Sequence, residues 1–519
     1  MIVDRVNLLS TELYRNSIVS VHIIFLSFMI FLNDLFFLLP ELFWIFSIIG
    51  FLLFSTVFTN KFRKILIVKL GHFYLYLIAL FGFLIYCVPI ADFNLLNYQY
   101  SHDSFTFTFK LLFLIFLSLC IYLSFEYFFF EKVFFIEYYF LVGFFCISSF
   151  FLVSSNDFTL FYLSIELQAL ILYTLASLKR YNVFSAESGL KYFVLGAFSS
   201  GLLLFGISLF YGFFGIFTFY DIKFIFLKWL GVNFLYGINM AIIFIFAALL
   251  FKLAAAPFHI WVPDVYEGAP TVVVLLFASL PKLAVFAFLI RFYISFLHEI
   301  TGIWYVTFFF AGLLSVLWGT FGALNQVNIK RLYAYSAIVN VGYLLTSLAY
   351  GTLESLVVMV NYLVVYLLST LSLFLVILAF RELSSFRKIK FIGEYSLYLT
   401  YSSLAAILFS LIFFSMAGVP PLAGFFIKFF LFKIVFLADF LLSPVVFIIL
   451  LTSVVSTLYY IRVVRFVFFD SKLTPIMLLT LNIGSAFLLV FSLVIIVLFV
   501  IFQPLALTCV TNILELAFL

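Results

Sequence analysis

Runs of about 20 apolar residues recur along nearly the whole chain, and they constrain its fold more than any other feature. An α-helix of that length crosses the hydrocarbon core of a bilayer and satisfies its backbone hydrogen bonds internally. A transmembrane β-barrel would instead show alternating segments of about 10 residues, and these runs do not alternate. The sequence therefore predicts an all-α integral membrane protein.

The balance of apolar and charged residues supports the same conclusion. Apolar residues make up 67% of the 519 residues and charged residues only 9%. A soluble fold of this length could not hide so much apolar surface behind so few charges, so the surplus must face membrane lipids. The net charge of +5 does not indicate a nucleic-acid partner, because the basic residues lie between the apolar runs.

The apolar runs predict about 14 membrane-spanning helices. Lysine and arginine are concentrated in the connections after odd-numbered helices, whereas the connections after even-numbered helices contain only Lys223 and Lys228. This separation predicts that the basic side faces the matrix or cytoplasm. A further apolar segment over 17–35 is interrupted by polar residues, and the sequence does not decide whether it forms one extra membrane-spanning helix. The predicted spans cover 39–58, 66–90, 107–128, 133–153, 158–178, 189–213, 234–268, 271–293, 302–324, 332–350, 355–380, 397–436, 443–467 and 476–502.

Charged residues stand inside several of these apolar runs. Glu166, Lys252 and Lys282 are each the only charge in the middle of a run, and Lys428 lies inside the twelfth run. Lys191 is the only charge in its run and lies nearer one end. A charge at the bilayer centre costs about 2.5–3.5 kcal/mol, so we expect these side chains to face the bundle interior and to serve a pathway. A lysine that reaches an interface or forms a fixed ion pair is the structural alternative.

Burial gives such groups a chemistry that they lack in water. Desolvation lowers the pKa of a lysine and raises that of a glutamate, while a nearby opposite charge acts in the other direction. A buried Lys–Glu pair therefore titrates as a coupled unit, and making or breaking the pair changes the affinity of the lysine for its proton. The pattern predicts a proton-pumping element rather than a site of covalent catalysis.

Prolines interrupt the seventh and twelfth runs, which are the two longest. Pro257 lies shortly after Lys252, and Pro420 lies shortly before Lys428. Proline removes a backbone donor, and freed backbone groups at membrane depth are tolerated only inside protein or beside water. The two runs are an odd number of spans apart and so cross in opposite directions, which is typical of inverted repeats with broken helices. Prolines that merely kink packed helices are the alternative.

These breaks divide the chain into predicted parts. Two inverted five-helix repeats, each with one proline-broken helix, follow three N-terminal helices. The parts are an N-terminal extension over 1–38 that can include an extra helix, three helices over 39–132, a first repeat over 133–293 with its broken helix at 234–268, a second repeat over 302–467 with its broken helix at 397–436, and a last helix with a C-terminal tail over 468–519.

The sequence predicts no metal site and no redox cofactor on this chain. Its four cysteines are scattered, its five histidines form no ligand pair, and no Gly-rich phosphate loop appears. The N-terminus carries Asp4 and Glu12 beside its arginines, which is not typical of an import presequence. The abundance of phenylalanine, 81 residues, favours an AT-rich coding genome such as that of an organelle.

One long stretch, FKLAAAPFHIWVPDVYEGAPTVVVLLFASLPK at 251–282, resembles the antiporter-like membrane-arm subunits of respiratory complex I, NADH:ubiquinone oxidoreductase. Similar stretches are LSIELQAL at 163–170, NQVNIKRLYAYSAIVNVGYLL at 325–345 and AGVPPLAGFFIKFFLF at 417–432. The segment PDVYEGAP is similar to the subunit 2 type rather than to subunits 4 and 5. The resemblance covers about residues 39–500.

This resemblance implies a proton-translocating subunit and assigns roles to the buried charges. It implies an ion pair between Glu166 and Lys252, a central proton carrier at Lys282 and a residue near the outlet at Lys428. The supporting positions are Lys191, Glu187, Asn340, Pro257, Pro420 and His259.

The resemblance also implies a molecular setting for the chain. NADH, FMN, iron–sulfur clusters and ubiquinone are expected on partner subunits and not on this chain. The expected partners are other membrane-arm subunits of complex I, including the neighbouring antiporter-like subunit 4. The expected location is the mitochondrial inner membrane, as a multi-pass and organelle-encoded protein.

The chain departs from the family at Asn340, where the family commonly has histidine. Asparagine cannot titrate near neutral pH, but its amide can orient water, so a hydrated chain is expected in place of a histidine relay. Two other functions stay open at this point. An Mrp-type sodium/proton antiporter subunit shares the fold and the lysines, and a purely structural membrane subunit would hold these charges as frozen pairs.

Overall fold

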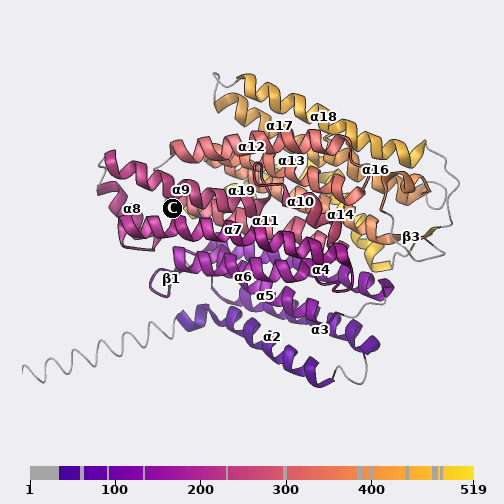
Figure 1. The fold of residues 1–519 in the computed structure, drawn as a ribbon, viewed down its shortest axis with the longest axis horizontal. Helices are drawn as coiled ribbons and strands as arrows, with labels where there is room; N and C mark the ends of the chain where they lie inside the picture. The colour runs from indigo at the N-terminus through magenta and orange to yellow at the C-terminus, as the bar shows by residue number, and fades with distance from the viewer. Residues whose placement is uncertain are drawn as a thin grey trace, which may run out of the picture.

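The protein is a bundle of long helices that run roughly parallel to one another, seen in a computed structural model (Figure 1). The structure describes residues 34–58, 63–89, 93–131, 135–228, 232–295, 301–382, 390–397, 403–438, 443–469, 477–479 and 483–518. Most of the segment over 17–35, left open as an extra helix, lies outside these described residues.

The predicted spans coincide with helices of the structure or, at the seventh and twelfth positions, with a pair of shorter helices. The helices are α2 (Leu39–Phe58), α3 (Arg63–Cys87), α4 (Ser104–Glu131), α5 (Glu137–Ser154), α6 (Phe158–Ala176), α7 (Val183–Phe214), α8 (Phe219–Lys228), α9 (Val232–Leu253), α10 (Trp261–Gly268), α11 (Thr271–Ser295), α12 (Thr301–Leu324), α13 (Ile329–Tyr350), α14 (Leu353–Ala379), the 3₁₀ helix η2 (Ile392–Leu397), α16 (Ser403–Ala417), α17 (Ala423–Ala438), α18 (Ser443–Phe468) and α19 (Ile483–Phe518).

Among the described residues, 12 helices are long and apolar enough to cross a membrane, and 13 when the bent helix α19 is counted as one span. The predicted twelfth span is divided between α16 and α17, each of which is shorter than a full span. The predicted all-α membrane fold is therefore confirmed.

Two short strand pairs cap the ends of helices. Strands β1 (Phe93–Leu95) and β2 (Tyr100–His102) pair antiparallel just before α4. Strands β3 (Phe380–Glu382) and β4 (Met477–Leu479) pair antiparallel and join the end of α14 to the start of α19. The last helix consequently starts later than the predicted residue 476.

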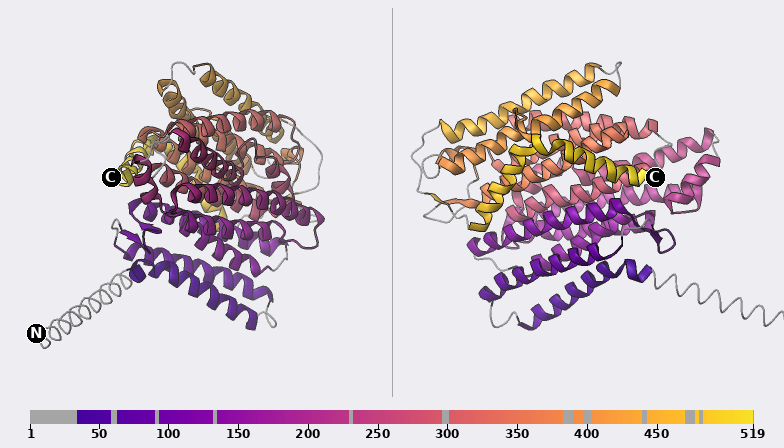
Figure 2. Two further views of the ribbon diagram at one scale, coloured as in Figure 1. Left: turned by 60° about the vertical axis from the view of Figure 1, so that its left-hand side comes forward. Right: turned by 180° about the vertical axis from the view of Figure 1, so that it is seen from behind.

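Helix α19 differs from the simple last span that the sequence predicts. Its two parts, Gly484–Phe499 and Ile501–Glu515, meet at 87°. Seen from behind, α19 lies across the bundle, where it packs on α14, α4 and α17 (Figure 2). The helix continues beyond residue 502 because the following residues remain mostly apolar.

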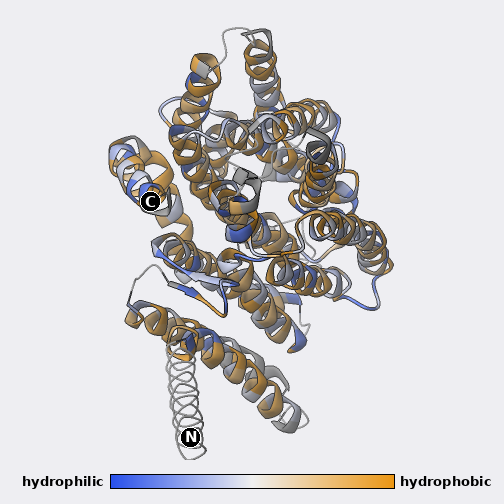
Figure 3. Ribbon diagram, turned by 90° about the vertical axis from the view of Figure 1, so that its left-hand side faces the viewer, coloured by the Kyte–Doolittle hydropathy of each residue, from blue (hydrophilic) through white to orange (hydrophobic). Residues whose placement is uncertain are grey.

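The core of the bundle is formed by α11, α13 and α14. The apolar window of α11 is completely buried, and those of α13 and α14 nearly so, whereas the windows of α2, α7 and α18 are mostly exposed. Seen along the helices, hydrophobic residues cover outward as well as inward faces (Figure 3). The outer helices thus offer apolar surface to lipid or to neighbouring subunits, and α11 is surrounded by protein.

The first helix break lies between α9 and α10. The chain leaves the helical path at Ala254, whose φ of 66° is left-handed, and a cis peptide bond precedes Pro257. The carbonyl of Phe251, in the last turn of α9, accepts hydrogen bonds from the backbone N–H of Ala254 at 3.0 Å and from the indole nitrogen of Trp261 at 3.3 Å. The side chain that begins α10 is thereby tied to the end of α9.

The second break lies between α16 and α17. Gly418 adopts a φ of 88°, and a β-carbon built on it would lie 3.2 Å from Cδ of Lys428. Glycine is therefore required here both for the left-handed backbone and for the close approach of the lysine. The predicted proline breaks are present at both sites, and the peptide bond between Pro420 and Pro421 is also cis.

Candidate functional site

Lys282 occupies the middle of α11, the most deeply buried helix. Its side chain is 3% exposed, and its ammonium donates a hydrogen bond to the hydroxyl of Tyr366 at 2.9 Å. The ammonium also lies 4.9 Å from the centre of the Tyr366 ring. No carboxylate of the described residues comes within 4.0 Å of it. The charge is thus solvated by one neutral phenol and not by an acid.

Lys428 is the second buried lysine without an acidic partner in the described part of the chain. It is 7% exposed, and its ammonium donates to the backbone carbonyls of Met416 at 2.9 Å and Ala417 at 3.0 Å. Both carbonyls belong to the last turn of α16, where the proline break removes their helical partners. The break therefore provides the acceptors that hold Lys428 at membrane depth.

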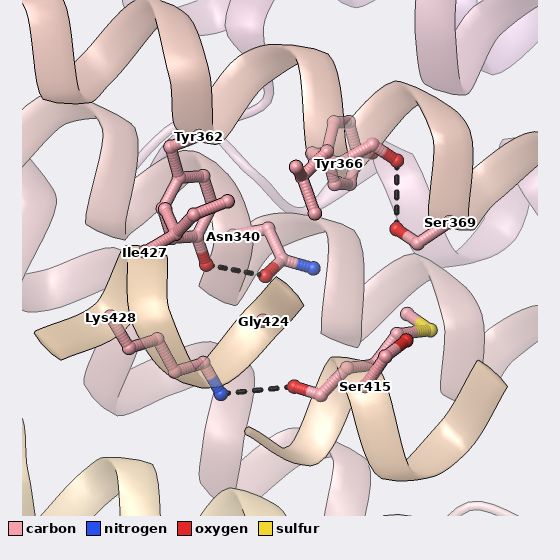
Figure 4. Close-up of a pocket in the computed structure, with 10 residues that line it drawn as sticks. Asn340, Tyr362, Tyr366, Ser369, Ser415, Gly424, Ile427 and Lys428 are labelled. Atoms are coloured by element: carbon pink, nitrogen blue, oxygen red, sulfur yellow. Dashed lines mark hydrogen bonds between the residues drawn. The ribbon is translucent and has the colours of Figure 1, made fainter. Parts of the chain in front are cut away.

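A small cavity of about 30 Å³ lies beside Lys428 and is also lined by Tyr366, the residue that contacts Lys282. A cavity needs roughly 10–15 Å³ to admit one water, so this space has room for about two. Figure 4 shows Lys428 on one side of the pocket, with Asn340 and Tyr362 on the other. The walls are formed by Asn340, Tyr362, Val365, Tyr366, Ser369, Ser415, Met416, Gly424, Ile427 and Lys428.

Asn340 lies in the wall of this cavity, as its expected role with water requires. Its side-chain oxygen accepts a hydrogen bond from the hydroxyl of Tyr362 at 2.9 Å, drawn as a dashed line in Figure 4. The amide is thereby fixed in orientation, and it offers hydrogen-bonding groups without carrying a titratable proton.

Tyr366 connects Lys282 to the cavity and was not identified from the sequence. Its hydroxyl accepts from Lys282, donates to the carbonyl of Ala278 at 3.0 Å and lies 3.4 Å from the hydroxyl of Tyr333. With 31 tyrosines in the chain, residue type alone gives little signal. A usable signal was the spacing of Tyr362 and Tyr366, which places both on one face of α14.

The predicted direct ion pair between Glu166 and Lys252 is not formed. The ammonium of Lys252 instead donates to the hydroxyl of Tyr173 at 3.3 Å, and Oε2 of Glu166 is buried without a hydrogen-bond partner. Glu166 and Tyr173 lie on one face of α6, two turns or about 10 Å apart. The two charges therefore interact through space and not through a direct hydrogen bond.

Lys191 is not a buried mid-membrane charge, contrary to the expectation from its isolated position in an apolar run. It is 43% exposed and pairs with Glu187 at 2.8 Å and Asp264 at 2.9 Å. Asp264 also accepts from Arg331 at 2.6 Å, and Arg331 reaches Glu267 at 2.9 Å. Lys191 lies in the N-terminal third of α7, on a face that joins this exposed network and not the core.

His259 lies in the first break, between Pro257 and α10. Its ring is partly buried, with the ring centre 6.3 Å from that of Trp318, and its Nδ1 has no hydrogen-bond partner. Nothing in these contacts joins His259 to Lys282 or Lys428. Pro257 and Pro420 act through the backbone breaks described above.

A buried ion pair in the N-terminal helices was also missed by the sequence reasoning. Lys110 of α4 lies 2.7 Å from Glu41 of α2, and Tyr100 donates to the same carboxylate at 2.6 Å. Neither Glu41 nor Lys110 was singled out from the sequence. Their meeting depends on how α2 packs beside α4, which no local pattern encodes.

A second ion pair joins the loop before α4 to the end of α11. Arg291 contacts both carboxylate oxygens of Asp103 at 2.7 Å, and it also contacts the hydroxyl of Ser101. Burial alone would raise the pKa of the Asp103 carboxyl, but the Arg291 guanidinium and hydrogen bonds from Thr106 outweigh burial and hold that pKa below its usual value.

Comparison with known proteins yields close relatives for this chain. The family model described as NADH:quinone oxidoreductase/Mrp antiporter, TM, matches residues 155–458. NADH-ubiquinone oxidoreductase chain 2 of Marchantia polymorpha is 41% identical over 61% of this chain and 64% of its own length. NADH-quinone oxidoreductase subunit N of Pelagibacter ubique is 36% identical over 85% of this chain and 91% of its own length. The match thus spans just under two thirds of the length of the Marchantia relative.

Solved structures share the architecture over nearly its full extent. A chain of respiratory complex I from Thermus thermophilus with bound aureothin has a TM-score of 0.72 and 26% identity, covering 90% of this chain and 98% of that chain. A chain of the Mrp complex from Dietzia sp. DQ12-45-1b has a TM-score of 0.73 and 17% identity, covering 92% and 98%, and shows a shared fold alone.

A polytopic helical bundle with two broken helices, and with a buried lysine at one break, defines the class of antiporter-like membrane subunits. The chain belongs to the NADH:quinone oxidoreductase/Mrp antiporter membrane family.

Proposed function

We propose that this chain moves protons across its membrane as an antiporter-like subunit of a respiratory NADH:quinone oxidoreductase. The observation that carries the proposal is the cavity lined by Lys428 and by Tyr366, the residue that contacts Lys282. Both lysines are buried and have no acidic partner among the described residues. A lysine held only by neutral oxygens can give up its proton and leave no unpaired carboxylate behind. The cavity offers water through which that proton passes.

The proposed path begins at Lys282 and ends toward Lys428. The ammonium of Lys282 gives its proton to the Tyr366 oxygen while the Tyr366 hydroxyl proton moves to cavity water, and water gives a proton to a neutral Lys428. Lys428 is then stabilised as an ammonium by the two carbonyls of the broken helix. Moving one charge against the membrane potential takes about 2.3 kcal/mol per 100 mV.

The driving input is proposed to arrive at Glu166 and Lys252. Lys252 now contacts Tyr173, and Oε2 of Glu166 has no hydrogen-bond partner and can accept a donor. A movement that brings Lys252 from Tyr173 to Glu166 would neutralise the positive charge of Lys252. The proton affinity of Lys282 responds to such a change because the intervening medium is poorly screening.

The redox chemistry is proposed to lie on partner subunits, in line with the names of the relatives. Those subunits would bind NADH, FMN, iron–sulfur clusters and the quinone, and this chain would hold no cofactor. We further propose an inner-membrane location, mitochondrial and organelle-encoded in view of the phenylalanine-rich composition, and contact with an antiporter-like subunit 4.

The test replaces Lys282 by methionine in the assembled complex, reconstituted into vesicles. Lys282→Met should lose the share of NADH-driven proton pumping that this chain contributes, because a thioether carries no proton. Lys433→Met is the matched control, since Lys433 is an exposed lysine of α17. Undiminished pumping in Lys282→Met, with normal assembly, would show that the buried charges are structural.

An Mrp-type antiporter subunit is the second candidate, because the matching family model covers both kinds of protein. The two functions separate in one measurement. The oxidoreductase subunit purifies with NADH dehydrogenase activity, whereas the antiporter subunit exchanges sodium for protons in its absence.

A further inference from the structure

We propose that Lys282 takes up its proton through the hydroxyl of Tyr333, which receives protons from water at Lys330. This inference rests on the proposed function, because it concerns the loading step of the same carrier. The path to Lys428 describes how the proton leaves Lys282. It does not describe how a neutral Lys282 is recharged from the opposite side.

Two tyrosine hydroxyls meet beside Lys282. Tyr333 of α13 is 1% exposed, and its hydroxyl oxygen lies 3.4 Å from that of Tyr366. Tyr366 donates its single hydroxyl hydrogen to the carbonyl of Ala278. Tyr333 is therefore the donor in the contact between the two hydroxyls. The donor direction runs from Tyr333 to Tyr366, toward Lys282.

Tyr333 lies near the start of α13. Lys330, Tyr333 and Asn340 follow one another at helical spacing on one face of α13. Lys330 lies in the first turn of the helix, and Asn340 lines the cavity beside Lys428. Tyr333 thus lies between the end of the bundle that begins α13 and the level of Lys282.

Lys330, at the proposed inlet, is not paired with an acid in the described part of the chain. The ammonium of Lys330 donates to the carbonyl of Ala269 at 2.8 Å and has no carboxylate within 4.0 Å among the described residues. The nearby acids Asp264 and Glu267 both form ion pairs with Arg331. Lys330 is only half-buried and lies where the basic connections of the chain gather. It therefore combines access to water with freedom from an acid that would hold its proton.

The loading step conserves protons along the path. The Tyr366 hydroxyl turns from Ala278 to the neutral amine of Lys282 and gives it a proton, forming the ammonium. The Tyr366 oxygen takes the proton of Tyr333, and the Tyr333 oxygen takes a proton from water at Lys330. Both tyrosines end neutral, and the net change is one proton moved from the start of α13 to Lys282.

The test compares two tyrosine-to-phenylalanine variants of α13 in the assembled complex. Tyr333→Phe removes the hydroxyl that touches Tyr366. Tyr335→Phe removes a hydroxyl on another face of the same helix, where the ring packs on Gly322. In vesicles, Tyr333→Phe should lose at least half of the pumping that Lys282→Met loses, and Tyr335→Phe should pump normally.

A second measurement separates slow loading from a disturbed structure. Acidifying the inlet side by one pH unit should restore much of the pumping of Tyr333→Phe, because a tenfold higher proton concentration speeds the loading step. Lys282→Met should gain nothing from acid. Should Tyr333→Phe fail to assemble, Lys330→Gln replaces it, with the same expectation of slowed pumping that acid restores.

Three results overturn the inference. The first is that Tyr333→Phe pumps as well as Tyr335→Phe at every pH. The second is that the loss of pumping in Tyr333→Phe persists unchanged on acidification. The third is that Lys330→Gln, where it is used, pumps like the unmodified complex. Any of these results removes Tyr333 as the inlet while a loss in Lys282→Met still supports the proposed function, so the two failures are distinguishable.

Discussion

Lys110 and Lys282 are equally buried lysines in two regions of the bundle, and their surroundings are opposite. Lys110, in the N-terminal helices, is 2% exposed and is paired with Glu41, with Tyr100 against the same carboxylate. Lys282, in the central helix, is 3% exposed, and among the described residues its ammonium donates a hydrogen bond to a phenol and to no acid. One charge is neutralised by an acid, and the other is held by neutral oxygens.

Under the proposed function, this difference is what distinguishes a structural lysine from a proton carrier. If Lys110 lost its proton, Glu41 would remain as an uncompensated buried anion, which is strongly unfavourable. If Lys282 loses its proton, a neutral amine remains beside a neutral hydroxyl. Burial is common to both lysines, so the proposal rests on the lack of a bound acid at Lys282.

The sharpest way to break this comparison is to remove the acid from Lys110. Glu41→Gln should destabilise the chain by about 3–5 kcal/mol, because it leaves a buried ammonium without its counter-charge. Thermal unfolding in detergent measures the effect. Lys282→Met should show no comparable loss, because it removes a buried charge that had no acid to leave behind.

The double variant Glu41→Gln with Lys110→Met serves as the control for this prediction. It should recover most of the stability, since no unpaired charge remains. Equal stability of Glu41→Gln and the unmodified chain would mean that Lys110 is no more constrained than Lys282.

A smaller effect is expected at the ion pair that joins Asp103 to Arg291, the end of the helix that carries Lys282. Because the pKa of Asp103 is lowered in the folded state, its stabilisation is complete above the ordinary carboxyl value of about 3.9 and is lost as pH falls through the lower value. Asp103→Asn should cost about 1.5–3 kcal/mol at pH 7. Its unfolding should then vary less between pH 5 and pH 3 than that of the unmodified chain, and equal pH dependence would contradict the assignment.

The smallest effect is expected at the exposed network around Asp264. Asp264→Asn should change the free energy of unfolding by less than about 1 kcal/mol, because partly exposed ion pairs are screened by solvent. The effect should shrink further at high salt, as measured by the same melting experiment. A loss as large as that of Glu41→Gln would place this network with the buried pairs.

The sequence was most informative where one residue type was rare in its surroundings. Lys282 stood alone in its apolar run and Lys428 lay inside another, and both are buried. Pro257 and Pro420 marked breaks that the structure contains. Lys191 was equally isolated but lies on an outward face of α7, because a charge in an apolar run does not reveal the face it occupies.

The residues that connect the lysines could not be predicted in the same way. Tyr333 and Tyr366 belong to one of the commonest residue types of this chain, and their contact depends on the packing of α13 against α14. Lys252 likewise donates to Tyr173 and not to Glu166, the expected partner. Which residue of α6 it meets depends on how α9 and α6 are placed in the bundle. Pairings between helices are a property of the assembled bundle.

The single hydrogen of the Tyr366 hydroxyl has a consequence for leakage. In the proposed path, a continuous chain of hydrogen bonds from one side of the membrane to the other would let protons flow back down the gradient. The path is interrupted at the Tyr366 oxygen, whose hydrogen is donated to the carbonyl of Ala278. Rotation of this one C–O bond would connect either the loading half or the release half of the path, so the proposed barrier to back-flow requires no large displacement of helices.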